Sequence, residues 1–247
     1  MGWFMRFVMA LAALVLAGTA PSQAADGFAD WGAVVVAGDF HAHDGSESEV
    51  FDNARRDIAA QLQRIGFSAD NVEQFSVRPE RYAPMPLQAE PQTVANALWD
   101  LSNRTSAGCL VYITSHGSSD GVLIGNVVVT PDALATMVSN ACGERPTVVI
   151  VSACYSGVFV PALAAANRLV LTAARPDRTS FGCGQTSRYT FFDECVLQEF
   201  PASHDFPGLA SLVQACVAAR EKKEKVSPPS EPQLSIGAGV IAGLPRW

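Results

Sequence analysis

The sequence predicts an α/β fold, a three-layer α/β/α sandwich with a mostly parallel central sheet. Two observations favour this class. Aliphatic runs such as Val148–Val151 do not alternate with polar residues, which is typical of strands buried on both faces. Between these runs lie segments such as Phe51–Ile65, in which apolar residues recur at helical spacing. Strands that alternate with helices along a chain indicate a parallel sheet covered by helices.

Each element predicted in the first half of the chain has a local signal. Unbroken apolar runs mark the strands, and apolar residues at helical spacing mark the helices. Gly66 ends the first helix, and four prolines between residues 78 and 91 indicate a loop. The predicted order is strand Ala33–Gly38, loop Asp39–Glu49, helix Phe51–Ile65, strand Val72–Val77, loop Arg78–Pro91, helix Thr93–Asn103 and strand Leu110–Thr114.

The second half of the chain begins with a hairpin. Gly125-Asn126 between two apolar runs is typical of a two-residue hairpin turn. Thr130 and Pro131 predict a helix start, with the threonine as cap and the proline in the first turn. The predicted order is hairpin Val122–Val129, a helix from Pro131, strand Val148–Val151, an Ala-rich helix after Gly157, strand Arg168–Ala173, loop Arg175–Ser187, helices Tyr189–Phe200 and Pro207–Lys225, and a closing segment Leu234–Ile241.

Length, charge and the first residues limit the class of protein. The 247 residues suffice for one large domain, and the net charge of −7 argues against a nucleic-acid-binding protein, which would need a basic surface. Met1–Ala24 has the features of a signal peptide: Arg6, the apolar run Phe7–Ala17 and a small-x-small cleavage site. We therefore expect an exported protein, periplasmic or secreted, without stable membrane insertion after cleavage. Residues 25–247 are predicted to form a single domain with a Pro-rich C-terminal segment.

Export changes the interpretation of the six cysteines, because an oxidising compartment favours disulfide bonds. Cys109 and Cys142 each lie near the start of a predicted strand, and they could be bridged if those strands are neighbours. The sequence does not assign the partners of Cys183, Cys195 and Cys216. If one cysteine must stay a free thiolate, an odd number remains, and at least one more is unpaired.

A thiol and an imidazole each follow a buried strand. Cys154 comes after Val148–Val151 in a turn of small residues, and His116 follows Leu110–Thr114. The carboxyl ends of parallel strands are where chemistry is placed in open α/β sheets. A nucleophilic cysteine with a histidine base needs these two groups, and the N–H groups of Gly117 and Cys154 could form an oxyanion hole. The alternative is a buried structural cysteine and a histidine with an ordinary polar role.

The two motifs, apolar strand–Ser–His–Gly and apolar strand–Ser–Ala–Cys–Tyr–Ser–Gly, resemble those of the legumain-type (asparaginyl endopeptidase) cysteine peptidases, within the caspase–gingipain group. VVVAG, RLVLTAA with Thr179–Gly184, and Tyr189–Phe192 also resemble segments of that family, in the same order. The similarity covers most of residues 31–200, and the tail Pro229–Gln233 is similar to that of exported bacterial members.

This resemblance implies a caspase-like domain that hydrolyses a peptide or protein substrate without a cofactor. Cys154 would form a thioester, with His116 as general base and then general acid. The residues implied for substrate binding are Ser152, Ser180, Phe181, and an acid at Asp193 or Glu194. The side chain bound before the cut stays open, because an acid in this pocket suits Arg or Lys as well as the family's asparagine.

Two alternatives differ in class from a cysteine peptidase. His41 and His43, followed by Asp44, resemble the opening of a metallo-hydrolase zinc motif, although Gly45 stands where a further histidine is expected. Stoichiometric metal and inhibition by a chelator would indicate zinc chemistry. The other alternative is a catalytically silent caspase-like domain that binds peptides. Retention of both His116 and Cys154 favours the enzyme.

Overall fold

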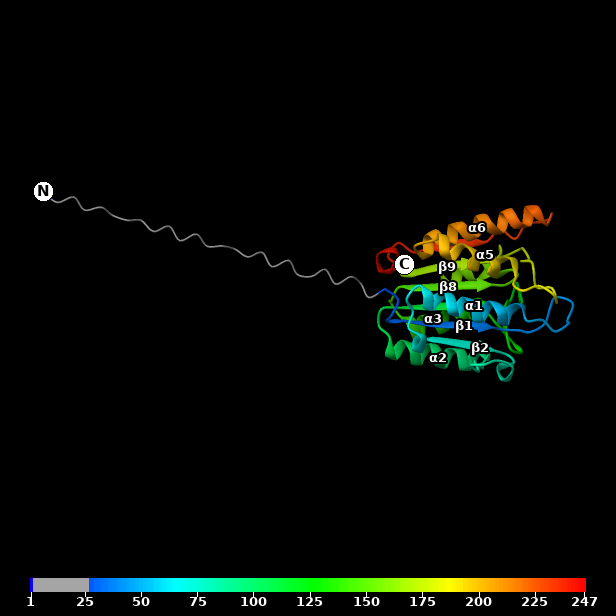
Figure 1. Cartoon of the computed structure of the whole chain (residues 1–247), viewed down its shortest axis with the longest axis horizontal. Helices are drawn as coiled ribbons and strands as arrows, with labels where there is room; N and C mark the ends of the chain where they lie inside the picture. The colour runs from blue at the N-terminus through cyan, green and yellow to red at the C-terminus, as the bar shows by residue number, and fades with distance from the viewer. Residues whose placement is uncertain (2–26) are drawn as a thin grey trace.

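A seven-stranded sheet forms the centre of the molecule (Figure 1). The computed structural model describes Met1 and residues 27–247, so all of the predicted signal peptide except Met1 lies outside the described residues. The strand order is β10-β9-β8-β4-β1-β2-β3, and every neighbouring pair is parallel except β10 with β9. The strands are β1 (Trp31–Ala37), β2 (Val72–Ser76), β3 (Leu87–Gln88), β4 (Gly108–Thr114), β8 (Thr147–Ser152), β9 (Arg168–Thr172) and β10 (Gln233–Ile236).

Helices cover both faces of this sheet. Successive residues of each central strand face opposite layers: Leu110 and Tyr112 of β4 belong to one core cluster, and Val111 and Ile113 belong to the other. The first layer consists of α1 (Val50–Arg64), α5 (Phe191–Glu199) and α6 (Phe206–Lys223), and the second of α2 (Pro91–Arg104), α3 (Pro131–Cys142) and α4 (Phe159–Leu163). The predicted three-layer sandwich with strands buried on both faces is confirmed.

A small antiparallel sheet follows β4. It consists of β5 (Gly117–Ser118), β6 (Gly121–Ile124) and β7 (Val127–Val129), and its second turn is at Gly125-Asn126, as predicted. Gly125 has a φ of +62°, a conformation that glycine adopts without steric cost. The predicted start of α3 is also confirmed, because Thr130 accepts a hydrogen bond from Ala133 N–H at 3.3 Å and Pro131 opens the helix.

The segment after Cys154 is less helical than the sequence predicts. Tyr155 has a left-handed φ of 58°, and a single 3₁₀ turn at Ser156–Val158 precedes the five-residue helix α4. The closing segment of the chain supplies β10, which pairs antiparallel with β9 at the sheet edge. Among the described residues, no helix has the length and apolar character needed to cross a membrane.

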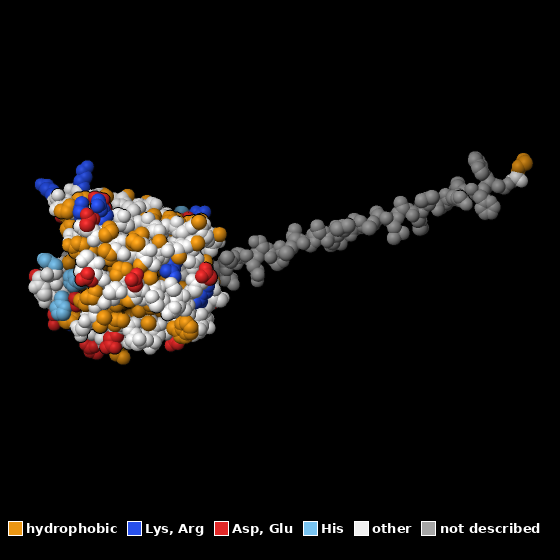
Figure 2. Space-filling view, turned by 180° about the vertical axis from the view of Figure 1, so that it is seen from behind, with side chains coloured by type: hydrophobic (Ala, Val, Ile, Leu, Met, Phe, Trp, Pro, Cys, Tyr) orange, Lys and Arg blue, Asp and Glu red, His pale blue; other side chains and the backbone are white. Residues whose placement is uncertain are grey.

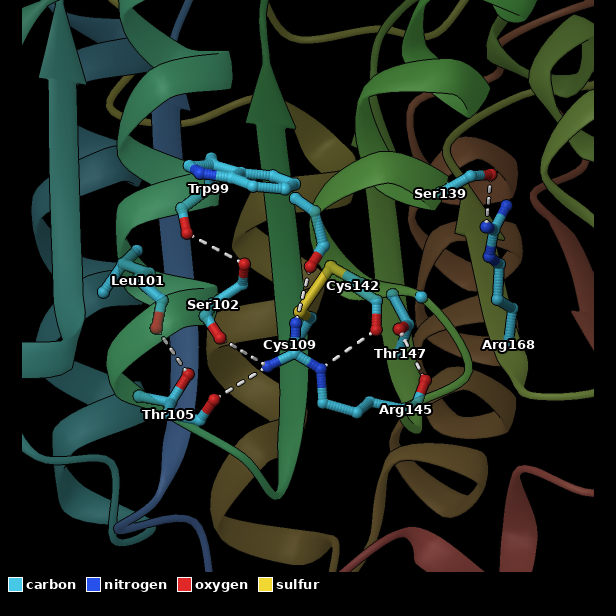
Figure 3. The surroundings of a disulfide bond; sticks show 12 residues. Trp99, Leu101, Ser102, Thr105, Cys109, Ser139, Cys142, Arg145, Thr147 and Arg168 are labelled. Carbon is cyan, nitrogen blue, oxygen red and sulfur yellow. Dashed lines mark hydrogen bonds between the residues drawn. A yellow bond between two sulfur atoms is a disulfide. The ribbon is translucent and has the colours of Figure 1, made fainter.

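One disulfide bond joins the sheet to a helix, and a second joins two helices of the same layer. Cys109 at the start of β4 is joined to Cys142 at the end of α3, as the sequence suggested, and Cys195 of α5 is joined to Cys216 of α6. Figure 3 shows the guanidinium of Arg145 beside the first bridge, where it donates to the carbonyl oxygens of Ser102 (3.1 Å) and Thr105 (2.8 Å). Cys154 and Cys183 are free thiols.

Candidate active site

The ends of three neighbouring strands position the candidate active site. The last residues of β1, β4 and β8 lie side by side in the sheet, as Ala37, Thr114 and Ser152. The ladder continues for one residue more, because Ser115 N–H donates to the carbonyl of Ser152 at 3.1 Å. Two positions beyond this row stand Asp39, His116 and Cys154. The strand register therefore brings a carboxylate, an imidazole and a thiol to one edge of the sheet.

The ring of His116 is held by backbone and side-chain groups of the β1 end. Its Nε2 lies 2.9 Å from the carbonyl oxygen of His41 and 4.0 Å from Oδ2 of Asp39. A carbonyl oxygen only accepts hydrogen bonds, so Nε2 carries a proton, and in the neutral ring Nδ1 is the basic nitrogen. The ring of Phe51 packs edge-on against the imidazole, with centroids 5.1 Å apart.

Asp39 is the residue of this site that sequence reasoning missed. Its side chain is 10% exposed, and Oδ1 accepts from Phe40 N–H (2.6 Å) and lies 2.8 Å from Nδ1 of His41. These contacts leave Oδ2 on the side of His116. The signal in the sequence is that Asp39 has the same offset from its strand as His116 and Cys154 have from theirs.

The thiol of Cys154 lies against the segment that follows β9. Its Sγ accepts from Ser180 N–H at 3.3 Å and lies 3.5 Å from the carbonyl oxygen of the same residue. The turn that carries Cys154 is held against the end of β9, because the buried hydroxyl of Ser156 accepts a hydrogen bond from Ala174 N–H at 3.2 Å. The nucleophile candidate and Ser180 therefore form one wall of the site.

The backbone N–H groups of Gly117 and Cys154 do not take part in the hydrogen bonds that pair the strands. Leu123 N–H donates to the carbonyl of His116 at 2.9 Å, so the next pair of the hairpin, Gly117 with Val122, is of the non-hydrogen-bonded kind. Within residues 27–247, the N–H of Cys154 has no acceptor. A Cβ on Gly117 would lie 2.4 Å from the carbonyl oxygen of Cys154, so only glycine permits this approach.

A cavity of about 710 Å³ opens between these groups. Its walls are the loop after β1, the loop after β9, and the side chains of His116 and Cys154. The two loops are joined, because His43 N–H donates to the carbonyl of Cys183 at 3.0 Å. Burial raises the pKa of the Cys183 thiol, and the nearby Cys154 raises it further. In Figure 2, histidine side chains (pale blue) gather at this end of the molecule.

The structure separates the residues predicted for substrate binding. Ser180 and Phe181 line the cavity. Ser152 is 1% exposed, Asp193 is 0% exposed, and neither is among the lining residues. Glu194 turns away to α6, where it pairs with Arg220. Ser152 and the acid expected at Asp193 or Glu194 therefore do not line this cavity: Ser152 is buried at the end of β8, and the first turn of α5 directs Asp193 into the core and Glu194 to a neighbouring helix.

Asp193 has a structural position beneath the site. Its carboxylate accepts from the hydroxyls of Tyr112 (2.7 Å), Thr114 (2.7 Å) and Thr190 (2.9 Å). Burial raises the pKa of this carboxyl, and the hydroxyl donors oppose the shift. The zinc alternative lacks ligands, because the described residues contain no group of three His, Cys, Asp or Glu side chains that could hold a metal ion.

Comparisons with known proteins identify the fold and the family of the chain. Caspase-1 from Spodoptera frugiperda is similar in structure, with a TM-score of 0.62 and 15% identity over 92% of this chain and 94% of that chain, which supports the caspase-like fold. A comparison with curated protein sequences finds no match. The model of the peptidase C13 family matches residues 77–225, more than half of the chain. The chain therefore belongs to the peptidase C13 family, the legumain-type cysteine peptidases.

Proposed function

We propose that this protein is a cysteine endopeptidase in which Cys154 is the nucleophile and His116 the general base and acid. One observation carries the proposal: the registered ends of β4 and β8 put both side chains, at the same offset, on the wall of one cavity. Membership of a cysteine peptidase family supports hydrolysis of a protein substrate.

The geometry suits a two-step hydrolysis. Nδ1 of His116 accepts the thiol proton while Sγ of Cys154 bonds to the substrate carbonyl carbon. The N–H groups of Gly117 and Cys154 donate to the oxyanion that forms. The imidazolium then protonates the leaving amine, the carbon–nitrogen bond breaks, and a thioester remains. Water attacks the thioester with His116 again as base, which releases the acid product and regenerates the thiol.

Asp39 is proposed as a positioning residue for this chemistry. Its carboxylate and the carbonyl of His41 both lie on the Nε2 side of His116. Together they hold the ring in the tautomer whose basic nitrogen is Nδ1, and they stabilise the imidazolium that forms in each step.

The cavity lining supports a polar, uncharged or acidic side chain before the cut rather than Arg or Lys. Its described walls contain the imidazoles of His41, His43 and His116 but no carboxylate, lysine or arginine. A basic substrate side chain would meet no opposite charge on these walls. Substrates with Asn or Asp before the cut should therefore be cleaved faster than matched substrates with Arg or Lys.

The two free thiols provide an internal comparison for testing the nucleophile. Alkylation by iodoacetamide, followed by mass spectrometry, should modify Cys154 faster than Cys183, whose pKa is raised by burial. His116→Ala should remove most of this difference. Fluorogenic peptides should be hydrolysed by the parent and not by Cys154→Ala. Equal labelling of both thiols together with no turnover would favour the silent peptide-binding domain instead.

We also propose that the protein is exported after removal of Met1–Ala24. The two disulfide bonds support an oxidising compartment. The N-terminal sequence of protein recovered from the periplasm or the culture medium tests this, with residue 25 as the expected start. Recovery only from the cytosol, with the N-terminal segment intact, would exclude export.

A further inference from the structure

A second cavity adjoins the candidate active site. Its volume is about 770 Å³, and His41 lines both cavities. Most of the walls come from three parts of the fold: the end of β1 at Asp39–His41, the β3–α2 junction at Gln88–Gln92, and the hairpin at Leu123–Val127; Val77 after β2 completes them. We call this cavity the hairpin groove.

Backbone contacts fix the walls of the hairpin groove. Gly125 N–H donates to the carbonyl of Gly38 at 2.9 Å, and Ala89 N–H donates to the carbonyl of Ser76 at 2.8 Å. A Cβ on Gly125 would lie 2.8 Å from the carbonyl oxygen of Ala89, so the hairpin turn packs directly on the end of β3. The hairpin groove is thus a preformed feature.

The position of the hairpin groove relative to the dyad indicates which part of a substrate reaches it. Ser180 contacts the Cys154 thiol on one side of the site. The hairpin groove begins at Asp39–His41, the segment that holds Nε2 of His116, on the other side. His116 protonates the leaving amine in the proposed reaction, so the chain that follows the cleaved bond departs on the His116 side.

The charge of the hairpin groove favours a basic occupant. Its lining includes the carboxylates of Asp39 and Glu90 and contains no lysine or arginine. Asp39 is engaged by the backbone and His41, whereas Glu90 is exposed and has no salt bridge among the described residues. Val127, which is 51% exposed, offers apolar surface to the methylene stem of a long basic side chain.

We propose that the hairpin groove binds the substrate segment after the cleaved bond and selects a Lys or Arg side chain there. This proposal rests on the proposed function, because it takes its direction from the roles of His116 and Cys154. Glu90 is the specificity-determining residue, since its carboxylate is the free anionic group of the groove.

The test uses peptides that are identical up to the cut and carry Lys, Gln or Glu at one of the first three positions after it. Cleavage is measured with the parent protein, and binding is measured by fluorescence anisotropy with Cys154→Ala, so that affinity is read without turnover. Glu90→Gln and Glu90→Lys are compared with Glu144→Gln and Glu144→Lys. Glu144 is an exposed acid just before β8, at the opposite edge of the sheet.

We expect the Lys peptide to exceed the Glu peptide by about fivefold in affinity and in kcat/KM at low salt, as for one partly screened ion pair. Glu90→Gln should reduce this ratio towards one, Glu90→Lys should invert it, and both Glu144 variants should keep the parent ratio. Turnover with a Lys-to-Glu ratio that the Glu90 variants leave unchanged would overturn the groove proposal alone. Absence of both binding and turnover would overturn the proposed function with it. Circular dichroism of each variant verifies that it is folded.

Discussion

Asp193 provides a test of how the core supports the candidate active site. Its buried carboxylate accepts from Tyr112 and Thr114 of β4, two to four residues before His116, and from Thr190 before α5. Thr190 in turn lies 3.4 Å from the hydroxyl of Ser152 at the end of β8. The perturbation is Asp193→Ala, which removes the acceptor that joins these hydroxyls.

The expected magnitude follows from the hydrogen bonds lost. The hydroxyl of Thr190 can donate instead to the hydroxyl oxygen of Ser152, which lies 3.4 Å away. Tyr112 and Thr114 are fully buried and lose their acceptor. At about 1–3 kcal/mol for each buried donor left unpaired, Asp193→Ala should lower the free energy of unfolding by about 4 kcal/mol. Asp193→Asn keeps an acceptor oxygen and should cost about 1 kcal/mol.

The pH dependence of stability gives a second readout. The pKa of the Asp193 carboxyl is raised by burial, so the folded chain binds this proton more tightly than the unfolded chain does. The contribution of the group therefore favours folding at acidic pH and is lost as pH rises from the unfolded pKa, about 3.9, to the folded one. Asp193→Asn cannot titrate. The free energy of unfolding of the parent, minus that of Asp193→Asn, should decrease across this interval and then become constant.

Urea denaturation between pH 4 and pH 8 measures both effects. Glu194→Gln is the matched control, because that neighbouring carboxylate pairs with Arg220 at the surface and should contribute at most about 1 kcal/mol. If Asp193→Ala and Glu194→Gln unfold at the same urea concentration, the buried network does not contribute as reasoned. If the difference between parent and Asp193→Asn is constant with pH, the raised pKa is wrong.

Three further predictions concern the site and the opposite edge of the sheet. Asp39→Ala should lower kcat about 100-fold with little change in KM, because the His116 ring loses its orientation but substrate contacts remain; steady-state kinetics with unchanged kcat would refute this role. Gly117→Ala should abolish measurable peptide hydrolysis, because its Cβ would lie 2.4 Å from the Cys154 carbonyl oxygen; the near-normal hydrolysis of a folded variant would contradict it. Replacing Cys109 and Cys142 by alanine opens a loop with a sequence separation of 33 and should lower stability by about 4 kcal/mol in urea denaturation; a loss below about 1 kcal/mol would show that the bridge adds little.

The fold could be predicted because its main signals are local. The central strands are apolar throughout, since both of their faces are buried, and the helices have capped starts such as that at Thr130. β3 and β5 could not be predicted, because each has two residues, and their strand character comes from pairing with β2 and β6. These strands form by pairing with other strands, and their own sequences contain no pattern of apolar residues that would predict them.

The substrate-binding acids show a different limit of sequence reasoning. Consecutive residues of an α-helix point about 100° apart. Asp193 and Glu194 therefore face different neighbours, and the sequence pattern does not say which of them, if either, faces the site. In the structure the first faces the core and the second faces α6. When a helical residue is assigned to a site from family spacing alone, the orientation of the helix about its axis must be known before the role of that residue can be stated.

The positions of Asp39, His116 and Cys154, by contrast, depend on the register of neighbouring strands and not on the rotation of a helix. Neighbouring strands lie about 4.8 Å apart, and the row Ala37–Thr114–Ser152 sets a common origin for the three segments that leave the sheet. Residues at equal offset from that row are neighbours in space although they are far apart in sequence. This is why the sequence could pair His116 with Cys154, which both follow recognisable strands and carry reactive groups. Asp39 is at the same offset, but an acid in a polar loop has no distinguishing sequence pattern, and only the strand register supports the positioning role that we propose for it.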